Sequence, residues 1–119
     1  MLNDFYTAAL ISSSESNAQY EVSFTENHDV FVGHFPGQPV VPGVCTTAIT
    51  KALLEKAIGM KLRMSEAKQI KFLQLLTPEV QPVASIKWIL KENGRYGLDS
   101  TWTVGDKAVY KLSAEMAVV

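Results

Sequence analysis

A histidine stands in a glycine- and proline-rich segment that leads directly into a predicted helix. His34 belongs to the run GHFPGQPVVPGV at positions 33–44, and the helix is expected to begin at Gly43. Imidazole titrates near neutral pH and is the most frequent general base in enzymes. Free N–H groups at a helix N-terminus can stabilise a developing oxyanion. A base and an oxyanion site in one pocket predict proton abstraction next to a carbonyl, with a structural role for His34 as the alternative.

The prolines of this run decide its local structure. Pro36, Pro39 and Pro42 fall within one short stretch and exclude both a regular helix and a central strand. Neighbouring apolar residues such as Phe35 and Val40 predict that the resulting extended loop is largely buried. A buried irregular loop leaves backbone polar groups to satisfy, so proteins usually retain one for a functional reason.

The helix expected after this loop has small residues at its start and a glycine at its end. Cys45, Ile49 and Leu53 share one apolar face, and Gly59 is a suitable C-terminal cap. A cysteine at a helix N-terminus can have a lowered thiol pKa, although a small packing residue is the simpler interpretation of Cys45. The small first turns allow this end of the helix to lie close against another element.

Alternation of apolar and polar residues predicts that most of the remaining chain forms strands. Residues 4–12 favour a strand or a mixed strand-helix segment, residues 20–24 favour a half-buried strand, and another strand is expected to begin at Ile70 and Phe72. An Asn-Gly pair and a Gly-Asp pair then separate three further strands of an antiparallel meander. These strands are expected at residues 84–90, 96–104 and 108–116. The sum is an α+β fold with one central helix against one long antiparallel sheet.

The run GHFPGQPVVPGV closely resembles the signature loop of the β-hydroxyacyl-ACP dehydratases of fatty-acid synthesis. The later run IKFLQLLTPEV at 70–80 is similar to the second strand of that family and the turn after it. The resemblance spans residues 5–118 and implies a single hotdog domain over 1–119, in which a sheet wraps around a central helix. It also implies that two subunits pair sheet edge to sheet edge, as a homodimer or as a heterodimer with a related hotdog chain.

The resemblance further implies a substrate and a set of roles. The substrate would be a thioester of acyl carrier protein or coenzyme A, with neither a metal nor a redox cofactor. His34 would remove the C2 proton, while backbone N–H groups at Gly43 and Val44 would polarise the thioester carbonyl. An Asp or Glu from the helix of the partner subunit would help the β-hydroxyl leave. The residues expected to shape the site are Gly33, Phe35, Pro36, Pro39 and Pro42.

The chain departs from the family pattern where that acid should stand, because position 48 is Ala48. Glu55 is the only acid on the predicted helix, and seven residues further along it would lie about 10 Å away. Proton transfer needs a separation of about 3 Å, so Glu55 is not expected to replace the missing acid. Thr46 and Thr47 lie near the right turn and can orient a water, but a hydroxyl is a poor acid at neutral pH.

The sequence is compatible with three functions. The first is dehydration of a 3-hydroxyacyl thioester to the trans-2-enoyl thioester, with the acid supplied by a partner subunit. The second is hydrolysis by a hotdog thioesterase, which usually needs an acid as well. The third is a non-catalytic subunit of a heterodimer that binds acyl-ACP.

The distribution of charge indicates which partners to expect. Residues 1–50 contain five acids and no Lys or Arg, whereas residues 51–119 contain all eleven bases and seven acids. The bases after position 50 are candidates for docking an acidic carrier protein, with a solvated helix end and loop as the alternative. The carrier-docking candidates are Lys51, Lys56, Lys61, Arg63 and Lys68.

Several classes of protein are not expected from the composition. No basic–aromatic motif for nucleic acid is present, and no apolar run approaches the ~18 residues of a membrane span. Cys45 is the single cysteine, so the chain forms no internal disulfide, which fits a reducing cytoplasm.

Overall fold

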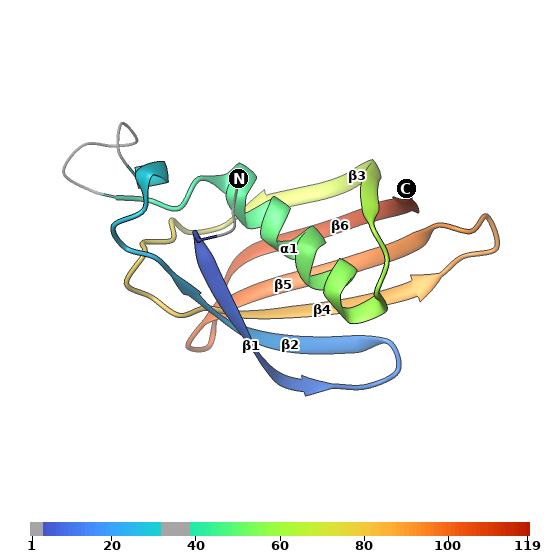
Figure 1. Cartoon of the computed structure of the whole chain (residues 1–119), viewed down its shortest axis with the longest axis horizontal. Helices are drawn as coiled ribbons and strands as arrows, with labels where there is room; N and C mark the ends of the chain where they lie inside the picture. The colour runs from blue at the N-terminus through green and yellow to red at the C-terminus, as the bar shows by residue number, and fades with distance from the viewer. Residues whose placement is uncertain (1–3, 32–38) are drawn as a thin grey trace.

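The computed structural model describes residues 4–31 and 39–119, which fold into six strands and one long helix (Figure 1). Their bounds in chain order are β1 Tyr6–Ser13, β2 Asn17–Phe24, the 3-10 helix η1 Asp29–Phe31, α1 Gly43–Ile58, β3 Leu62–Phe72, β4 Val83–Leu90, β5 Tyr96–Val104 and β6 Lys107–Val118.

All six strands belong to one antiparallel sheet in the order β1-β2-β4-β5-β6-β3. The helix α1 crosses one face of this sheet, and the sheet curves around it (Figure 1). The consecutive strands β4, β5 and β6 form the predicted meander. Their turns are built around Gly94 and Gly105, which have φ values of 81° and 64° that favour glycine.

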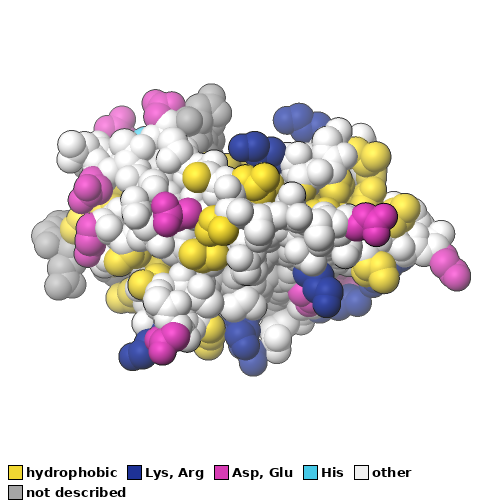
Figure 2. Space-filling model, turned by 90° about the horizontal axis from the view of Figure 1, so that it is seen from below, with side chains coloured by type: hydrophobic (Ala, Val, Ile, Leu, Met, Phe, Trp, Pro, Cys, Tyr) yellow, Lys and Arg dark blue, Asp and Glu magenta, His cyan; other side chains and the backbone are white. Residues whose placement is uncertain are grey.

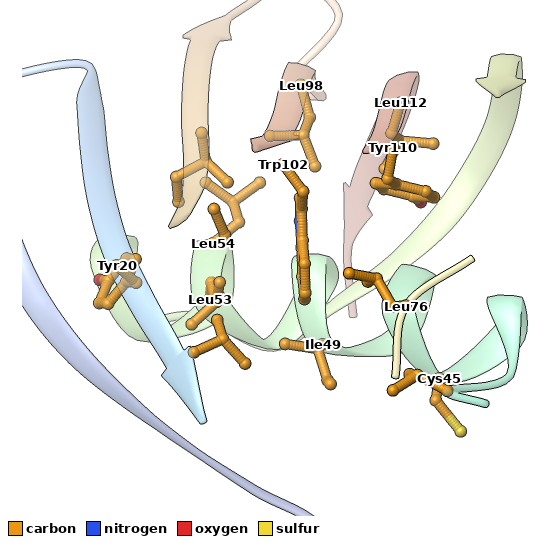
Figure 3. Close-up of a cluster of buried hydrophobic side chains, with 14 of the residues drawn as sticks. Tyr20, Cys45, Ile49, Leu53, Leu54, Leu76, Leu98, Trp102, Tyr110 and Leu112 are labelled. Atoms are coloured by element: carbon orange, nitrogen blue, oxygen red, sulfur yellow. The ribbon is translucent and has the colours of Figure 1, made fainter. Parts of the chain in front are cut away.

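The core lies between α1 and the inward face of the sheet. Ile49 and Leu53 of the helix are buried against Leu98 and Trp102 of β5. Figure 3 shows Trp102 extending from its strand toward the helix beside Ile49, with Tyr110 projecting inward from β6. Side chains alternate between the two faces along each strand, so large side chains are buried under the helix. Their size fixes the distance between α1 and the sheet.

The predicted helix and meander are confirmed. The helix begins at Gly43 and ends at Ile58, and Gly59 caps it in the left-handed conformation with φ 72°. The segment at 4–12 forms the strand β1, and the strand expected at 20–24 is β2, which begins a few residues earlier, at Asn17.

One prediction about the strands is wrong. Ile70 and Phe72 do not begin a strand but end β3, which starts at Leu62. The pairing of β3 with β6 shifts register twice, between Met64 and Glu66 and between Ala67 and Gln69. Each bulge inverts the alternation of side chains, so the strand has no continuous period of two that a sequence pattern can reveal. Part of the basic segment, for which a solvated helix end and loop is the alternative to a docking surface, is therefore an edge strand.

No helix in the described residues is long and apolar enough to span a membrane.

Candidate active site

The N-terminus of α1 has backbone donors that are not bonded to any described residue. Pro42 is the N-cap residue, with φ −62° and ψ 140°, and no side chain of the described residues caps the helix. Its carbonyl oxygen accepts hydrogen bonds from the N–H groups of Cys45 and Thr46 at 2.9 and 3.3 Å. Within residues 4–31 and 39–119, no group accepts a hydrogen bond from the N–H of Gly43 or Val44. These two donors sit at the positive end of the helix dipole, where negative charge is stabilised.

A cavity of about 280 Å³ opens beside this helix start. Its walls come from the segment before the helix, from the end of β3 and the loop after it, and from β6. The lining residues are Val40, Val41, Pro42, Gly43, Thr46, Phe72, Gln74, Leu75, Leu76, Val109 and Tyr110. The lining is mostly apolar, with the helix N-terminus on one side, which is suited to an acyl group whose carbonyl points at the helix.

Gly43 and Phe72 meet closely at the edge of this cavity. A Cβ atom at position 43 would lie 2.6 Å from Cε1 and 2.7 Å from Cζ of the Phe72 ring. The absence of a side chain at Gly43 therefore lets the ring lie directly against the first helical residue. The same ring lies 5.4 Å from that of Tyr110, centroid to centroid, so two aromatic side chains border the helix start.

Buried hydroxyl groups tie the first two turns of α1 to the sheet. The Tyr110 phenol and the Thr47 hydroxyl form a 2.7 Å hydrogen bond. One turn further along, Trp102 Nε1 donates to Thr50 Oγ1 at 3.0 Å, and that hydroxyl donates to the carbonyl of Thr46 at 2.8 Å. Burial raises the pKa of Tyr110 above its ordinary value, so its phenol stays neutral near pH 7. Such a network fixes the rotation of the helix about its axis.

Ala48 faces a different hollow from Gly43. It lines a shallow depression on the outer side of the helix, next to the start of β3, and it does not line the cavity at the helix start. The residues around this depression are Val44, Thr47, Ala48, Lys51, Arg63 and Met64. A longer side chain at position 48 would therefore point away from the cavity of its own chain.

The acid of the helix is engaged elsewhere. Oε2 of Glu55 accepts a hydrogen bond of 2.8 Å from the N–H of Leu62 and lies 3.6 Å from Nζ of Lys51. This carboxylate thus holds the first residue of β3 to the C-terminal half of the helix. Its position agrees with the expectation that Glu55 does not replace an acid at position 48.

Several predicted site residues cannot be placed. Gly33, His34, Phe35 and Pro36 lie outside the described residues. Pro39 is exposed, whereas Pro42 is half-buried and lines the cavity.

The other histidine and the single cysteine have structural positions. His28 is half-buried; its Nδ1 accepts a hydrogen bond from Val30 N at 3.0 Å, and its ring packs on Phe5. Cys45 is buried, and burial raises the pKa of its thiol, as suits a packing residue.

Four of the five carrier-docking candidates lie in pairs, because Lys51 and Arg63 border one depression and Lys56 and Lys61 border another. Lys51 donates to the carbonyl of Leu62 at 3.0 Å, and the Lys56 ammonium lies 5.9 Å from the Tyr20 ring centroid. Lys61, Arg63 and Lys68 are exposed on and before β3. Figure 2 shows acidic side chains at both ends of the face seen from below, with more of them toward the end that carries η1.

Tyr110 and Phe72 are site residues that the sequence pattern did not single out, and Thr47, considered there only as a hydroxyl that can orient a water, is bonded to Tyr110. Tyr110 lies within the strand predicted at 108–116, and nothing in the sequence indicates which helical residue it meets. The one available signal was its hydroxyl group on a face otherwise formed by residues such as Leu112, because a buried phenol usually has a hydrogen-bond partner. In the described part of the chain, no cluster of three or more His, Cys, Asp or Glu side chains could hold a metal ion.

A six-stranded antiparallel sheet curved around one helix, with a cavity at the helix N-terminus, defines the class of hotdog proteins. The sequence model of the ApeI dehydratase family, described as ApeI-like, matches residues 10–109. The chain therefore belongs to the ApeI-like dehydratase family. No curated protein matches the sequence.

Three solved structures illustrate the shared fold. The dehydratase heterocomplex ApeI:P from Xenorhabdus doucetiae has a chain with 20% identity and a TM-score of 0.79, and the match covers 93% of this chain and 98% of that one. An HP0420 homologue from Helicobacter felis has 12% identity and a TM-score of 0.72, with coverages of 100% and 92%. A hypothetical thioesterase with coenzyme A from Streptococcus pneumoniae has 9% identity and a TM-score of 0.71, with coverages of 95% and 86%.

Proposed function

We propose that this chain is one subunit of a 3-hydroxyacyl thioester dehydratase and that a related hotdog chain supplies the acid. His34 takes a proton from C2 of the substrate, and the N–H groups of Gly43 and Val44 stabilise the negative charge that develops on the thioester oxygen. As C2=C3 forms, the C3–O bond breaks, and the partner's carboxylic acid protonates the departing hydroxyl to release water. The product is a trans-2-enoyl thioester.

The position of Ala48 carries this proposal. Residue 48 lies in a depression beside β3, apart from the cavity at Gly43. An acid at this position would act on a neighbouring subunit and not on its own cavity. Replacing that acid by alanine therefore leaves this chain able to use an acid from its partner, while it can offer none in return. A dimer of two different chains then has one complete site.

The family and one neighbour support the same conclusion. The chain belongs to a dehydratase family, and the Xenorhabdus doucetiae structure is a dehydratase heterocomplex. The apolar cavity suits an acyl chain on acyl carrier protein or coenzyme A.

Complementation between the wild-type chain and one variant, each expected to be inactive alone, tests the proposal. The wild-type chain has the base and no acid, whereas a His34→Ala/Ala48→Glu variant has the acid and no base. Hydration of crotonyl-CoA, the reverse reaction, is followed by the loss of enoyl-thioester absorbance at about 0.5 M NaCl, where repulsion between like-charged chains is screened. We expect little turnover from either protein alone and at least about 100-fold more from their mixture, because a general acid contributes 10²–10⁴-fold.

The control mixture replaces the double variant by His34→Ala, which offers no acid and should stay inactive. A mixture as inactive as its separate components would contradict shared chemistry between subunits. Release of free thiol without hydration would instead assign the site to a thioesterase.

A further inference from the structure

The strand β3 forms one edge of the sheet and is eleven residues long. One side of its backbone pairs with β6, and no described strand pairs with the other side. A long edge with unpaired N–H and C=O groups is a template for another strand unless its side chains prevent pairing. The side chains of β3 therefore decide what can pair there.

Those side chains make the edge positive. The charged residues of β3 are Arg63, Glu66, Lys68 and Lys71, all of them exposed, which gives the strand a net charge of +2.

Glu66, the single acid of the strand, and the base Lys68 both lie near Lys91, in a cluster of charged side chains on the β6 side. Glu66 is in register with Glu115, whose carboxylate contacts Lys91 at 2.9 Å and Arg95 at 3.1 Å. Lys71 has no such compensation, because it lies in register with Lys111. The uncompensated charges of the edge are therefore positive.

Apolar side chains continue the edge toward the cavity. Ile70 is 38% exposed, Phe72 60% and Leu73 48%, while Val44 of the helix is 78% exposed. The cavity at Gly43 and the depression at Ala48 both adjoin β3. A strand paired with β3 would thus cover apolar surface and lie next to both halves of the proposed site.

The opposite edge of the sheet has a different character. The strand β1 contains no charged residue, and its pairing with β2 is interrupted between Leu10 and Ser12. Neither the cavity nor the depression is lined by a residue of β1. Of the two edges, β3 is the one on which a partner can complete the site.

We infer that β3 pairs with the edge strand of a second hotdog chain that is acidic, and that its positive charge disfavours pairing with a copy of itself. The inference rests on the proposed two-subunit site and adds how the partner is selected. A symmetric dimer would bring two strands of charge +2 side by side, and like charges on neighbouring strands are destabilising. An acidic strand would instead attract the basic side chains of β3, so pairing with an acidic partner is favoured over pairing with a second copy of the chain.

Salt dependence of self-association gives the first test. Sedimentation velocity of the wild-type chain alone should show mostly monomer at about 0.05 M NaCl and a dimer at least about tenfold tighter at about 0.5 M, because salt screens the repulsion. A tight wild-type dimer at low salt, or one weakened by salt, would overturn the inference.

A charge-reversed variant provides the acidic edge directly. Lys68→Glu/Lys71→Glu changes the net charge of β3 from +2 to −2 and should also be monomeric alone at low salt. Mixed with the wild-type chain it should form a dimer that salt weakens. The matched control Lys87→Glu/Lys107→Glu makes the same change in net charge at exposed positions on β4 and β6, and it should not pair with the wild-type chain.

Pairing of the control as strong as that of the edge variant would overturn the inference, because net charge and not the edge would then be responsible. A mixture with no dimer, together with binding of an acyl carrier protein that the edge variant loses, would assign these lysines to the carrier instead. Sedimentation needs no turnover, so a mixed dimer without hydration activity would contradict the proposed reaction and leave the pairing rule intact.

Discussion

The Tyr110 phenol oxygen and the Thr47 hydroxyl oxygen lie 2.7 Å apart, and their hydrogen bond joins β6 to the first turns of α1. Thr47 is next to the position of the missing acid, while Tyr110 lines the cavity that contains Gly43. This one hydrogen bond therefore fixes the position of the helix relative to both the cavity at Gly43 and the depression at Ala48. Tyr110 acts as a positioning residue in this account.

Removal of that phenol should weaken both stability and turnover. We expect Tyr110→Phe to lower the free energy of unfolding by about 1 kcal/mol, the usual net value of one hydrogen bond. In the mixture of the wild-type chain with His34→Ala/Ala48→Glu, the substitution should lower kcat and leave KM nearly constant. The reason is that the helix start is displaced while the binding surface is retained. The control is Tyr96→Phe, since Tyr96 makes no side-chain hydrogen bond with a described residue. Equal effects of both substitutions on kcat would argue against a positioning role.

The close approach of Gly43 and Phe72 predicts a steric effect that a second substitution relieves. In Gly43→Ala the new Cβ would meet the Phe72 ring at 2.6 Å. Because the ring is 60% exposed and can move outward, we expect a loss of only about 1 kcal/mol in chemical denaturation. Phe72→Leu in the same chain should recover most of that loss. If the double variant is as much less stable than Phe72→Leu as Gly43→Ala is than the wild-type chain, the strain does not come from the Phe72 ring.

Glu115 should make stability depend on acid pH. The Lys91 ammonium and the Arg95 guanidinium beside it hold the pKa of this carboxyl below its ordinary value. A lowered folded-state pKa gives stability that is present above the unfolded-state pKa and is lost as the pH falls through the folded-state value. The melting temperature of the wild-type chain should therefore fall below about pH 4 more steeply than that of Glu115→Gln. Parallel profiles would contradict this assignment.

Glu55 provides a test of the claim that no other acid on the helix serves the reaction. Glu55→Gln weakens the hydrogen bond from Leu62 N and should lower the unfolding free energy by about 1 kcal/mol. Hydration by a complete mixture should stay within about twofold of the wild-type rate, because the carboxylate faces β3. A loss of 100-fold or more with the fold intact would make Glu55 the replacement acid.

The sequence determined the helix and the meander because their signals are local. Pro42 and Gly59 bracket the helix, and turn glycines separate strands of regular alternation. The strand β3 escaped prediction because two bulges interrupt its alternation and its exposed edge is rich in charge. Contacts between distant segments, such as that of Phe72 with Gly43, require the register of β3 and the height of the helix, which no local pattern contains.

The site could be predicted only in part from the sequence, for the same reason. The absence of an acid at Ala48 is visible in the sequence. That residue 48 faces a depression separate from the cavity follows only from the packing of α1 against β3 and β6. The roles of His34 and of the loop around it remain predictions.

Hydration of crotonyl-CoA by Ala48→Glu decides whether this subunit lacks only its acid. The measurement is made without any partner, at about 0.5 M NaCl so that the positive edges are screened and identical chains can pair. We expect little turnover for the wild-type chain, at least about 100-fold more for Ala48→Glu, and none when His34→Ala is added. A wild-type chain that hydrates crotonyl-CoA as fast as Ala48→Glu would contradict the claim that this subunit lacks its acid.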